Sequence, residues 1–115
     1  MMLLAATQDA ATAPPTAYHR SMGWVLIAWQ NALWQLCHAV NLEEGVVDTV
    51  RRGGDTDTNA AICGALLGAV YGQDSIPAQW REALLNCRPA ASAPWVRHPG
   101  RSAMGRWTPW NWPPN

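Results

Sequence analysis

Two carboxylates and a hydroxyl lie within four residues of one another, as Asp55, Asp57 and Thr58, directly after the glycine pair Gly53–Gly54. Glycines at this point let the backbone turn tightly before the next element begins. Oxygen ligands of these kinds suit a hard divalent cation, Mg²⁺ or Mn²⁺, rather than zinc. One residue, Thr56, separates the two aspartates, so both carboxylates can converge on one side of the loop. The run therefore predicts metal ligands at the mouth of a helix.

This acidic loop offers too few ligands for a complete catalytic centre. Mg²⁺ and Mn²⁺ take about six oxygen ligands in an octahedral array, and the loop supplies about three. The remaining acidic candidates form no second ligand-like cluster in the sequence; they are Glu43, Glu44, Asp48 and Asp74. We interpret the loop as about half of a metal site. The alternative is an ordinary helix cap with a solvated turn, since Asp and Thr are favoured there.

The acidic loop is expected between the second and third of four helices. The first helix, from about Met22 to Ala39, is apolar on nearly every side, which predicts burial inside something larger than this chain. Asn41 can cap the second helix, and Glu44 stands three residues later, as in a capping box. This second helix should end before Gly53.

Small residues fill the helix that follows the loop, which is expected from about Thr58 to Tyr71 with Gly72 as its stop. Gly64 and Gly68 share one face, where we expect close approach of another helix backbone. A membrane dimer face is the alternative, but the helix is too short to span a bilayer. Pro77 fits the first turn of a fourth helix. No alternation with period two appears, so the expected fold class is all-α.

One continuous block of the sequence resembles the C-terminal metal-binding motif of the ADP-ribosylglycohydrolases, the family of dinitrogenase-reductase-activating glycohydrolase and the ADP-ribosyl-acceptor hydrolases. The block reads GGDTDTNAAICGALLGAVYG, followed by Ile76-Pro77 and then Trp80. Glycine pair, acidic loop, small-residue helix and Ile-Pro restart appear in the family's order, and the resemblance covers about residues 22–87. It implies that this all-α chain is the C-terminal part of a larger multi-helix bundle.

The resemblance also implies a reaction and a cofactor. Members of the family hydrolyse the glycosidic bond between ADP-ribose and a protein side chain at a binuclear Mg²⁺ or Mn²⁺ centre. By resemblance Asp55, Asp57 and Thr58 are metal ligands and Gly53 and Gly54 contact substrate, while no catalytic residue is assigned. The family's N-terminal ligand motifs are absent from this chain. The implied partners are an ADP-ribosylated protein or other ADP-ribose-containing substrate, and the missing N-terminal half of the enzyme.

Composition limits the other possibilities. The formal net charge is +0, which gives no electrostatic footprint for nucleic acid or an anionic membrane. No apolar run is long enough for a bilayer span, so we expect a cytoplasmic protein. The three cysteines lack metal spacing and are expected to be buried thiols.

We expect His38 in the core or at its rim, and a further set of aromatic side chains in the core: Trp24, Trp29, Trp34 and Trp80.

Three regions are expected along the chain: a linker or disordered N-terminus at 1–20, the ADP-ribosylglycohydrolase C-terminal helical region at 21–89, and an irregular tail at 90–115. The tail ends in a Trp-rich and Pro-rich string that no fold favours. A one-base shift of the reading frame after Pro99 permits an Asp cap followed by an amphipathic helical pattern. We therefore interpret the tail as frameshifted, with a genuine disordered tail as the alternative.

The sequence thus favours a metal-dependent ADP-ribosylglycohydrolase fragment that is inactive in isolation. The alternative is a catalytically inactive remnant, acting as a structural or interaction fragment, or a pseudogene product. A phosphoryl-transfer enzyme with an Asp-x-Asp metal loop is disfavoured, because the chain lacks a Gly-Lys phosphate cradle.

Overall fold

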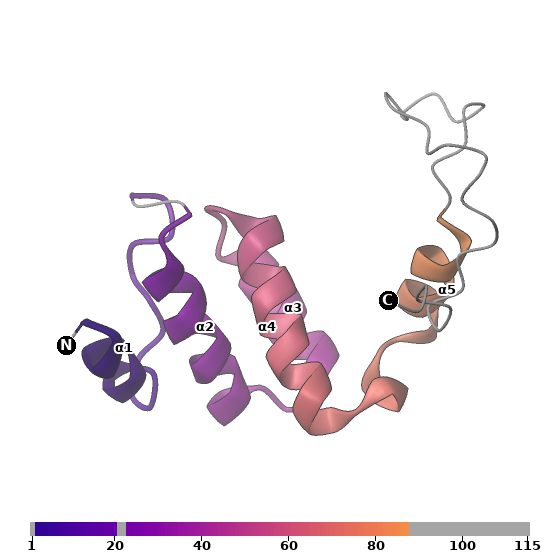
Figure 1. Cartoon of the computed structure of the whole chain (residues 1–115), viewed down its shortest axis with the longest axis horizontal. Coiled ribbons are helices and arrows are strands. Elements are labelled where there is room, and N and C mark those ends of the chain that lie inside the picture. Colours follow the sequence, from indigo (N-terminus) through magenta and orange to yellow (C-terminus); the bar gives the residue numbers. More distant parts are fainter. Residues whose placement is uncertain (1, 21–22, 88–115) are drawn as a thin grey trace, which may run out of the picture. The chain divides into compact units, whose positions relative to one another are not determined.

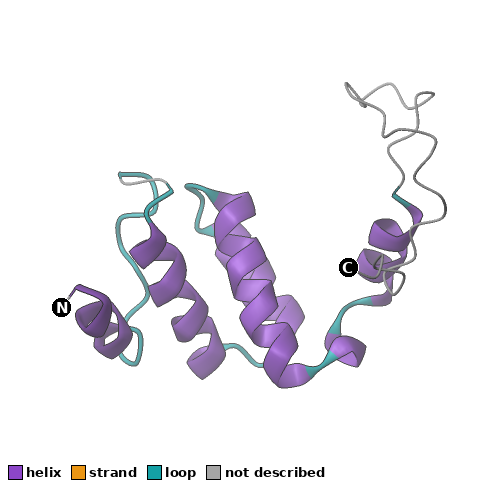
Figure 2. Cartoon of the chain, viewed as in Figure 1, coloured by secondary structure: helices purple, strands orange, loops and turns teal. Residues whose placement is uncertain are grey.

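The computed structural model describes residues 2–20 and 23–87, and these residues form helices without any strand (Figure 2). The elements in order are α1 (Met2–Asp9), α2 (Val25–His38), α3 (Leu42–Arg51), α4 (Thr56–Tyr71), the short 3-10 helix η1 (Gln73–Ser75) and α5 (Ala78–Asn86). This confirms the all-α class. The chain divides into two compact units, Met1–Arg81 and Glu82–Asn115, and the candidate site lies in the first.

Three helices of the first unit share one core. α4 packs against both α2 and α3, and α1 lies along α2 (Figure 1). The buried centre consists of Ala32, Leu42, Cys63 and Leu67, with one or more members from each of α2, α3 and α4. Full burial of a leucine-sized side chain contributes about 2 kcal/mol. Partly buried apolar side chains surround this centre; they are Leu36, Val46, Leu66, Ile76 and Trp80.

The helix boundaries around the acidic loop follow the local signals in the sequence. The Asn41 side chain accepts a hydrogen bond from the Glu44 amide at 2.9 Å, which confirms it as the N-cap of α3. Gly72 ends α4 with a φ of +82°, and its amide donates to the Gly68 carbonyl at 2.9 Å. However, α4 begins at Thr56, two residues earlier than expected. Asp57 therefore lies in its first turn.

The close helix approach occurs at a different glycine from the two expected. A Cβ on Gly64 would lie 3.6 Å from Val46 Cγ2, and a Cβ on Gly68 would lie 3.9 Å from Leu42 Cδ1. Both are ordinary contact distances, so neither position requires glycine. By contrast, a Cβ on Gly45 of α3 would lie only 2.5 Å from Leu67 Cδ1. The expected close approach of another helix at Gly64 and Gly68 is therefore wrong, and the tight contact between α3 and α4 lies at Gly45 instead.

The N-terminal segment is not the linker expected for residues 1–20, because Met2–Asp9 form α1. This helix packs on α2 and buries Ala6. The Trp29 indole on α2 donates a hydrogen bond to the Thr7 hydroxyl at 2.9 Å. Pro14-Pro15 follow the end of α1, so they do not interrupt it. The tail at 90–115, including its proposed frame shift, lies outside the described residues.

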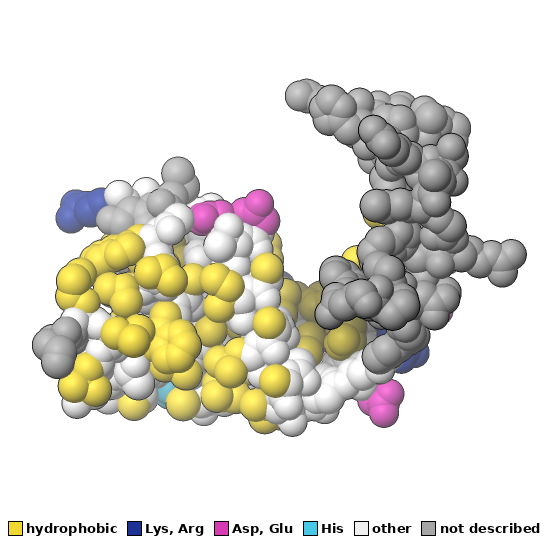
Figure 3. All heavy atoms as spheres, in the orientation of Figure 1, with side chains coloured by type: hydrophobic (Ala, Val, Ile, Leu, Met, Phe, Trp, Pro, Cys, Tyr) yellow, Lys and Arg dark blue, Asp and Glu magenta, His cyan; other side chains and the backbone are white. Residues whose placement is uncertain are grey.

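α2 is not buried on all sides as its composition predicted. Its exposed apolar side chains join those of α1 in a surface that we call the apolar face (Figure 3). The members of the apolar face are Met2, Leu3, Leu4, Trp24, Val25 and Trp29. The expectation of core tryptophans is therefore wrong for Trp24 and Trp29, which are 45% and 39% exposed. Within the described ranges no helix is long and apolar enough to cross a membrane.

The cysteines and His38 divide between core and surface. Cys63 is buried, whereas Cys37 and Cys87 are exposed, so the expectation of three buried thiols holds for one. His38 is exposed and stacks on Trp34 with ring centroids 3.6 Å apart. Its Nδ1 lies 2.9 Å from the Trp34 carbonyl oxygen. His38 is therefore a rim residue rather than a core residue.

Candidate functional site

The acidic loop joins α3 to α4 and is shaped by its two glycines. Gly53 and Gly54 have φ values of +77° and +73°, a region that favours glycine over residues with a Cβ. The chain then enters α4, with the Asn59 amide donating to the Asp55 carbonyl at 3.0 Å. Asp55 is thus the N-cap residue, and Asp57 follows in the first turn. The loop brings both aspartates to one end of α4.

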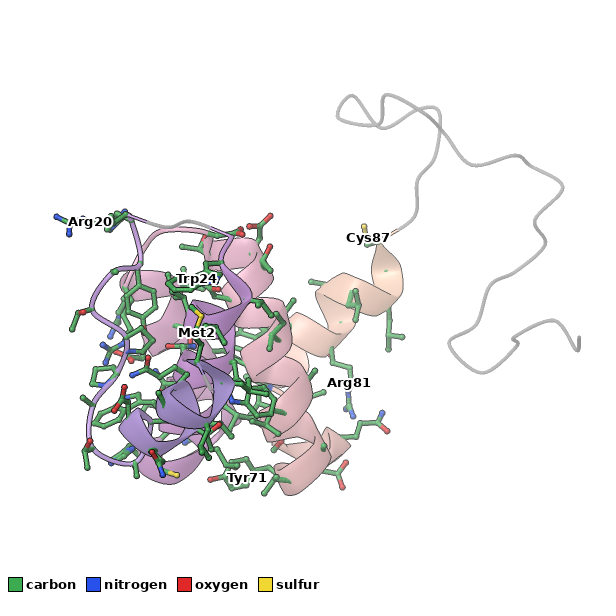
Figure 4. All side chains as sticks on the ribbon, turned by 60° about the vertical axis from the view of Figure 1, so that its left-hand side comes forward. Met2, Arg20, Trp24, Tyr71, Arg81 and Cys87 are labelled. Carbon is green, nitrogen blue, oxygen red and sulfur yellow. The ribbon has the colours of Figure 1, made fainter. Side chains whose placement is uncertain are left out.

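A second segment lies directly on the glycine pair. A Cβ on Gly54 would overlap the backbone carbonyl of Tyr18, and a Cβ on Gly53 would lie 2.5 Å from Cε1 of His19. Arg20 follows and points away from the helices (Figure 4). Glycine is therefore required at positions 53 and 54 for two reasons, the positive φ and the close contact with Tyr18 or His19. No short sequence motif predicts this contact, because Tyr18 and His19 precede the glycine pair by about 35 positions.

The two aspartates interact with each other, and this interaction lowers the pKa of Asp57. A hydrogen bond with the Asp55 side chain lowers the pKa of Asp57, and hydrogen bonds from the backbone amides of Thr58 and of Asp57 itself act in the same direction. The helix N-terminus also favours negative charge at this point. Asp57 and Thr58 are exposed and Asp55 is half-buried. An ionised, accessible carboxylate beside a second carboxyl group is a suitable ligand pair for a hard cation.

The donor set of the loop fits part of a Mg²⁺ or Mn²⁺ shell. It offers two carboxyl groups and the Thr58 hydroxyl, all oxygen donors of the kind these cations take. Among the described residues there is no group of three or more His, Cys, Asp and Glu side chains placed to hold a metal. The structure therefore brings Asp55 and Asp57 together and adds no further acidic ligand from residues 2–20 and 23–87.

The other acidic candidates lie elsewhere. Glu43, Glu44 and Asp48 line a groove of about 600 Å³ beside α2 and α3, together with Trp34, His38 and Arg51. Asp48 accepts hydrogen bonds from Arg52 Nε at 2.6 Å and from Gln35 Nε2 at 2.5 Å. Burial alone would raise the pKa of Asp48, but these hydrogen bonds and the Arg52 charge outweigh it and lower the pKa. Asp48 thus binds Arg52 instead of joining the acidic loop.

A buried chain of polar side chains lies beneath the segment that covers the glycine pair. The Tyr18 hydroxyl donates to Asn31 Oδ1 at 2.7 Å, and Asn31 Nδ2 donates to the Thr49 hydroxyl at 2.9 Å. The Thr49 hydroxyl in turn donates to the Gly45 carbonyl at 2.7 Å. We refer to Tyr18, Asn31 and Thr49 as the tyrosine network. The sequence offered one signal, the polar interruption of α2 by Asn31 and Gln35, which was not connected to the site.

Comparisons with known proteins identify the family of this chain. The sequence model of the family described as ADP-ribosylglycohydrolase matches residues 2–105, and so includes α1 as well as the block at 22–87. The ADP-ribosylarginine hydrolase Tri1 of Serratia proteamaculans is 32% identical over 66 residues, which is 57% of this chain and 18% of that protein. The ADP-ribosyl-[dinitrogen reductase] glycohydrolase of Rhodospirillum rubrum is 34% identical over 61 residues, which is 53% of this chain and 21% of that protein.

The human ADP-ribosylhydrolase ARH3 is 40% identical over 42 residues, which is 36% of this chain and 12% of that protein. The stretches matched in these three relatives are thus at most 21% of their lengths. No solved structure matches the chain. The family match over most of the sequence, together with the glycine pair and acidic loop that it includes, shows that the chain belongs to the ADP-ribosylglycohydrolase family.

Proposed function

We propose that this chain supplies one part of the active site of a metal-dependent ADP-ribosylglycohydrolase, which hydrolyses the glycosidic bond between ADP-ribose and a protein side chain. The observation that carries the proposal is the acidic loop. In a chain of this family, Asp55 and Asp57 lie side by side at the start of α4, and their interaction lowers the pKa of Asp57. The substrate is an ADP-ribosylated protein or another ADP-ribose-containing molecule.

Each residue of the acidic loop has a proposed role. The carboxylates of Asp55 and Asp57 and the hydroxyl of Thr58 hold Mg²⁺ or Mn²⁺. A bound cation of this kind orients substrate and lowers the pKa of a bound water. Gly53 and Gly54 present backbone without side chains, which lets the substrate approach the loop closely. No acid or base among the described residues is assigned a catalytic role.

We propose that the remaining ligands come from the N-terminal helical part of such an enzyme, acting as the partner of this chain in the cytoplasm. The ligand count supports this, since the loop fills only part of an octahedral shell. The apolar face supports it as well, because the six exposed apolar side chains of α1, of α2 and of its N-cap Trp24 have no cover within the described residues. Large exposed apolar patches mark interaction surfaces.

A second candidate is a catalytically inactive remnant with a structural or interaction role, including a pseudogene product. The observation that favours it is the lack of a third acidic ligand near the acidic loop in the part of the chain that the structure describes. On this view the family's fold persists without the reaction. Neither nucleic acid nor a membrane is a proposed partner.

Titration with Mn²⁺, followed by electron paramagnetic resonance, tests the proposed ligands. We expect Asp57→Asn to weaken binding by at least about tenfold, because even residues behind the ligands change metal affinity by 10–100-fold. Asp74→Asn is the matched control, since Asp74 is an exposed aspartate on η1 outside the acidic loop. Equal affinities for Asp57→Asn and the unaltered chain would contradict the proposal.

Mixing the chain with a separately produced N-terminal half of a family member separates the two candidates. The hydrolase proposal expects release of ADP-ribose from ADP-ribosyl-arginine only in the mixture and only with metal. Metal binding without release in the mixture would favour the inactive remnant.

A further inference from the structure

We propose that Tyr18 is a positioning residue for the acidic loop: its backbone lies on the glycine pair, and its buried hydroxyl fixes that backbone to α2 and α3. The inference rests on the proposed function, because it assigns Tyr18 a role through the metal ligands. It concerns a residue outside the ligand motif, about 37 positions before Asp55.

The first step is the anchoring of the Tyr18 side chain. Tyr18 is 6% exposed, and the other two members of the tyrosine network, Asn31 and Thr49, are fully buried. The hydrogen bonds have one direction, from Tyr18 to Asn31, from Asn31 to Thr49 and from Thr49 to the Gly45 carbonyl. Burial raises the pKa of Tyr18 to about 12, so the hydroxyl remains a donor at every physiological pH. The orientation of the ring is therefore determined by α2 and α3.

The second step is the contact between Tyr18 and the glycine pair. The Tyr18 carbonyl occupies the place where a Cβ on Gly54 would lie. His19 covers Gly53 in the same way, and Gly23 approaches the Asp55 carboxylate, to which its Cβ would lie at 3.4 Å. Tyr18, His19 and Gly23 thus border three consecutive positions of the acidic loop, from Gly53 to Asp55. A shift of Tyr18 would remove the surface against which the loop is packed.

The third step is the fixing of the loop from its other side. Arg52 directly precedes the glycine pair and is held by Asp48, with Nε to Oδ2 at 2.6 Å. Its guanidinium carbon also lies 5.9 Å from the centroid of the Tyr18 ring, a separation typical of a cation–π contact. Arg52 therefore connects the start of the loop to the ring of the residue whose backbone covers Gly54. Tyr18 contacts the loop through its backbone and through its aromatic face.

Amide hydrogen exchange on the full chain without metal tests this arrangement. Two amides report on the loop: Thr56, which donates to the Gly54 carbonyl at 3.0 Å, and Asn59, which donates to the Asp55 carbonyl at 3.0 Å. We expect Tyr18→Phe, which removes only the hydroxyl, to accelerate exchange at both by about tenfold, the factor that one lost buried hydrogen bond produces. The Gly72 amide at the far end of α4 should keep its rate.

Tyr71→Phe is the matched control, because it removes the hydroxyl of the other tyrosine of the chain, which is 40% exposed on α4. It should leave the rates of Thr56 and Asn59 unchanged. Unchanged loop rates in Tyr18→Phe would overturn the proposal, and so would an equal acceleration along the whole of α4, which would indicate a purely structural role.

A double variant keeps the test decisive if Tyr18→Phe alone fails to fold. In Tyr18→Phe/Asn31→Leu the buried Asn31 oxygen that has lost its donor is removed as well, together with the hydrogen bond from Asn31 to Thr49, so part of the lost stability should return. The positioning role expects the loop amides to stay fast in this variant, whereas full recovery of their protection would overturn it.

A Mn²⁺ titration of the same variants separates this inference from the proposed function. We expect about tenfold weaker binding in Tyr18→Phe, the effect typical of residues behind a metal ligand. If Asp57→Asn leaves Mn²⁺ affinity unchanged, the proposed function fails, and the exchange rates still decide whether Tyr18 positions the loop. If only Asp57→Asn weakens Mn²⁺ binding and the loop rates are unchanged, the positioning role alone fails.

Discussion

The acidic loop and the apolar face lie in the same compact unit and differ in whether their side chains have partners within the chain. Around the loop, polar groups are paired: Tyr18, Asn31 and Thr49 bond one another, and Arg52 bonds Asp48. Among the described residues no buried side-chain nitrogen or oxygen lacks a hydrogen-bond partner. On the apolar face, by contrast, Leu3, Leu4 and Val25 are each more than half exposed.

This difference shows which properties the chain can supply by itself. Hydrogen bonds within α2 and α3, and the contacts of Tyr18 and His19 with the glycine pair, determine the shape of the loop. Nothing in the described residues covers the apolar face, and burying it would add stability in proportion to its area. We therefore expect substitutions near the loop to change folding free energy and substitutions on the apolar face to change association instead.

The largest effect is expected at the glycine pair. Gly54→Ala should lower the free energy of unfolding by about 3 kcal/mol, because it adds a positive-φ strain of 1–3 kcal/mol and an overlap with the Tyr18 backbone. Gly72→Ala is the matched control, since Gly72 has a φ of +82° and no atom within 4 Å of its added Cβ. It should lose only the positive-φ strain of about 1–3 kcal/mol, without the added overlap. Urea unfolding measures both, and equal losses would show that Tyr18 does not press on Gly54.

A smaller, pH-dependent effect is expected at Asp48. Since its pKa is lowered in the folded chain, the ionised carboxylate stabilises the fold above its ordinary pKa of about 3.9. This contribution is lost as pH falls from there through the lowered folded pKa. The Asp48 and Arg52 side chains are 38% and 27% exposed, so solvent screening limits the contribution to about 0.5 kcal/mol.

Asp48→Asn tests this titration. The variant should be less stable than the unaltered chain at pH 7, and the two should converge as the pH falls below the ordinary aspartate pKa of about 3.9 and through the lowered folded pKa, as measured by urea unfolding at each pH. A stability difference that does not change between these pH values would mean that the charge of Asp48 makes no contribution.

The smallest effect on stability is expected on the apolar face. Leu4→Gln/Val25→Gln should change the free energy of unfolding by less than about 0.5 kcal/mol, because both side chains are mostly exposed. Self-association at high concentration should fall, as measured by sedimentation velocity. Val70→Gln, at an exposed position on α4 outside the apolar face, should leave association unchanged. A large loss of stability in the double variant would show that the apolar face is already covered.

Local signals predicted most of the secondary structure. The Asn41 cap, the stop at Gly72 and the small-residue run after the loop placed α3 and α4 to within two residues. α1 was missed because residues 1–20 as a whole are rich in Ala, Thr and Pro, as is typical of a linker, and because the helix is held by contact with α2. Such a contact is a property of the folded unit and leaves no periodic signature in eight residues.

The candidate site was predicted in part. The spacing of Asp55 and Asp57 indicated two neighbouring carboxyl groups, and the structure brings them together. Their role as metal ligands stays a prediction. The tyrosine network was missed because its hydrogen bonds join residues 13 and 18 positions apart. No helical or strand period relates such positions, so only the packing of α2 on α3 identifies them.

Gly45 has a consequence for the order in which this unit folds. Its carbonyl accepts from Thr49 and from the Cys63 thiol at 3.8 Å, and a Cβ there would lie 2.5 Å from Leu67 Cδ1 and 3.5 Å from Gln35 Cβ. Segments from α2, α3 and α4 thus converge on one residue that has no side chain. Because loop closure must precede such non-local contacts, we expect this convergence to form only when the three helices come together. We therefore expect the geometry of the acidic loop to be a product of tertiary assembly rather than of local structure.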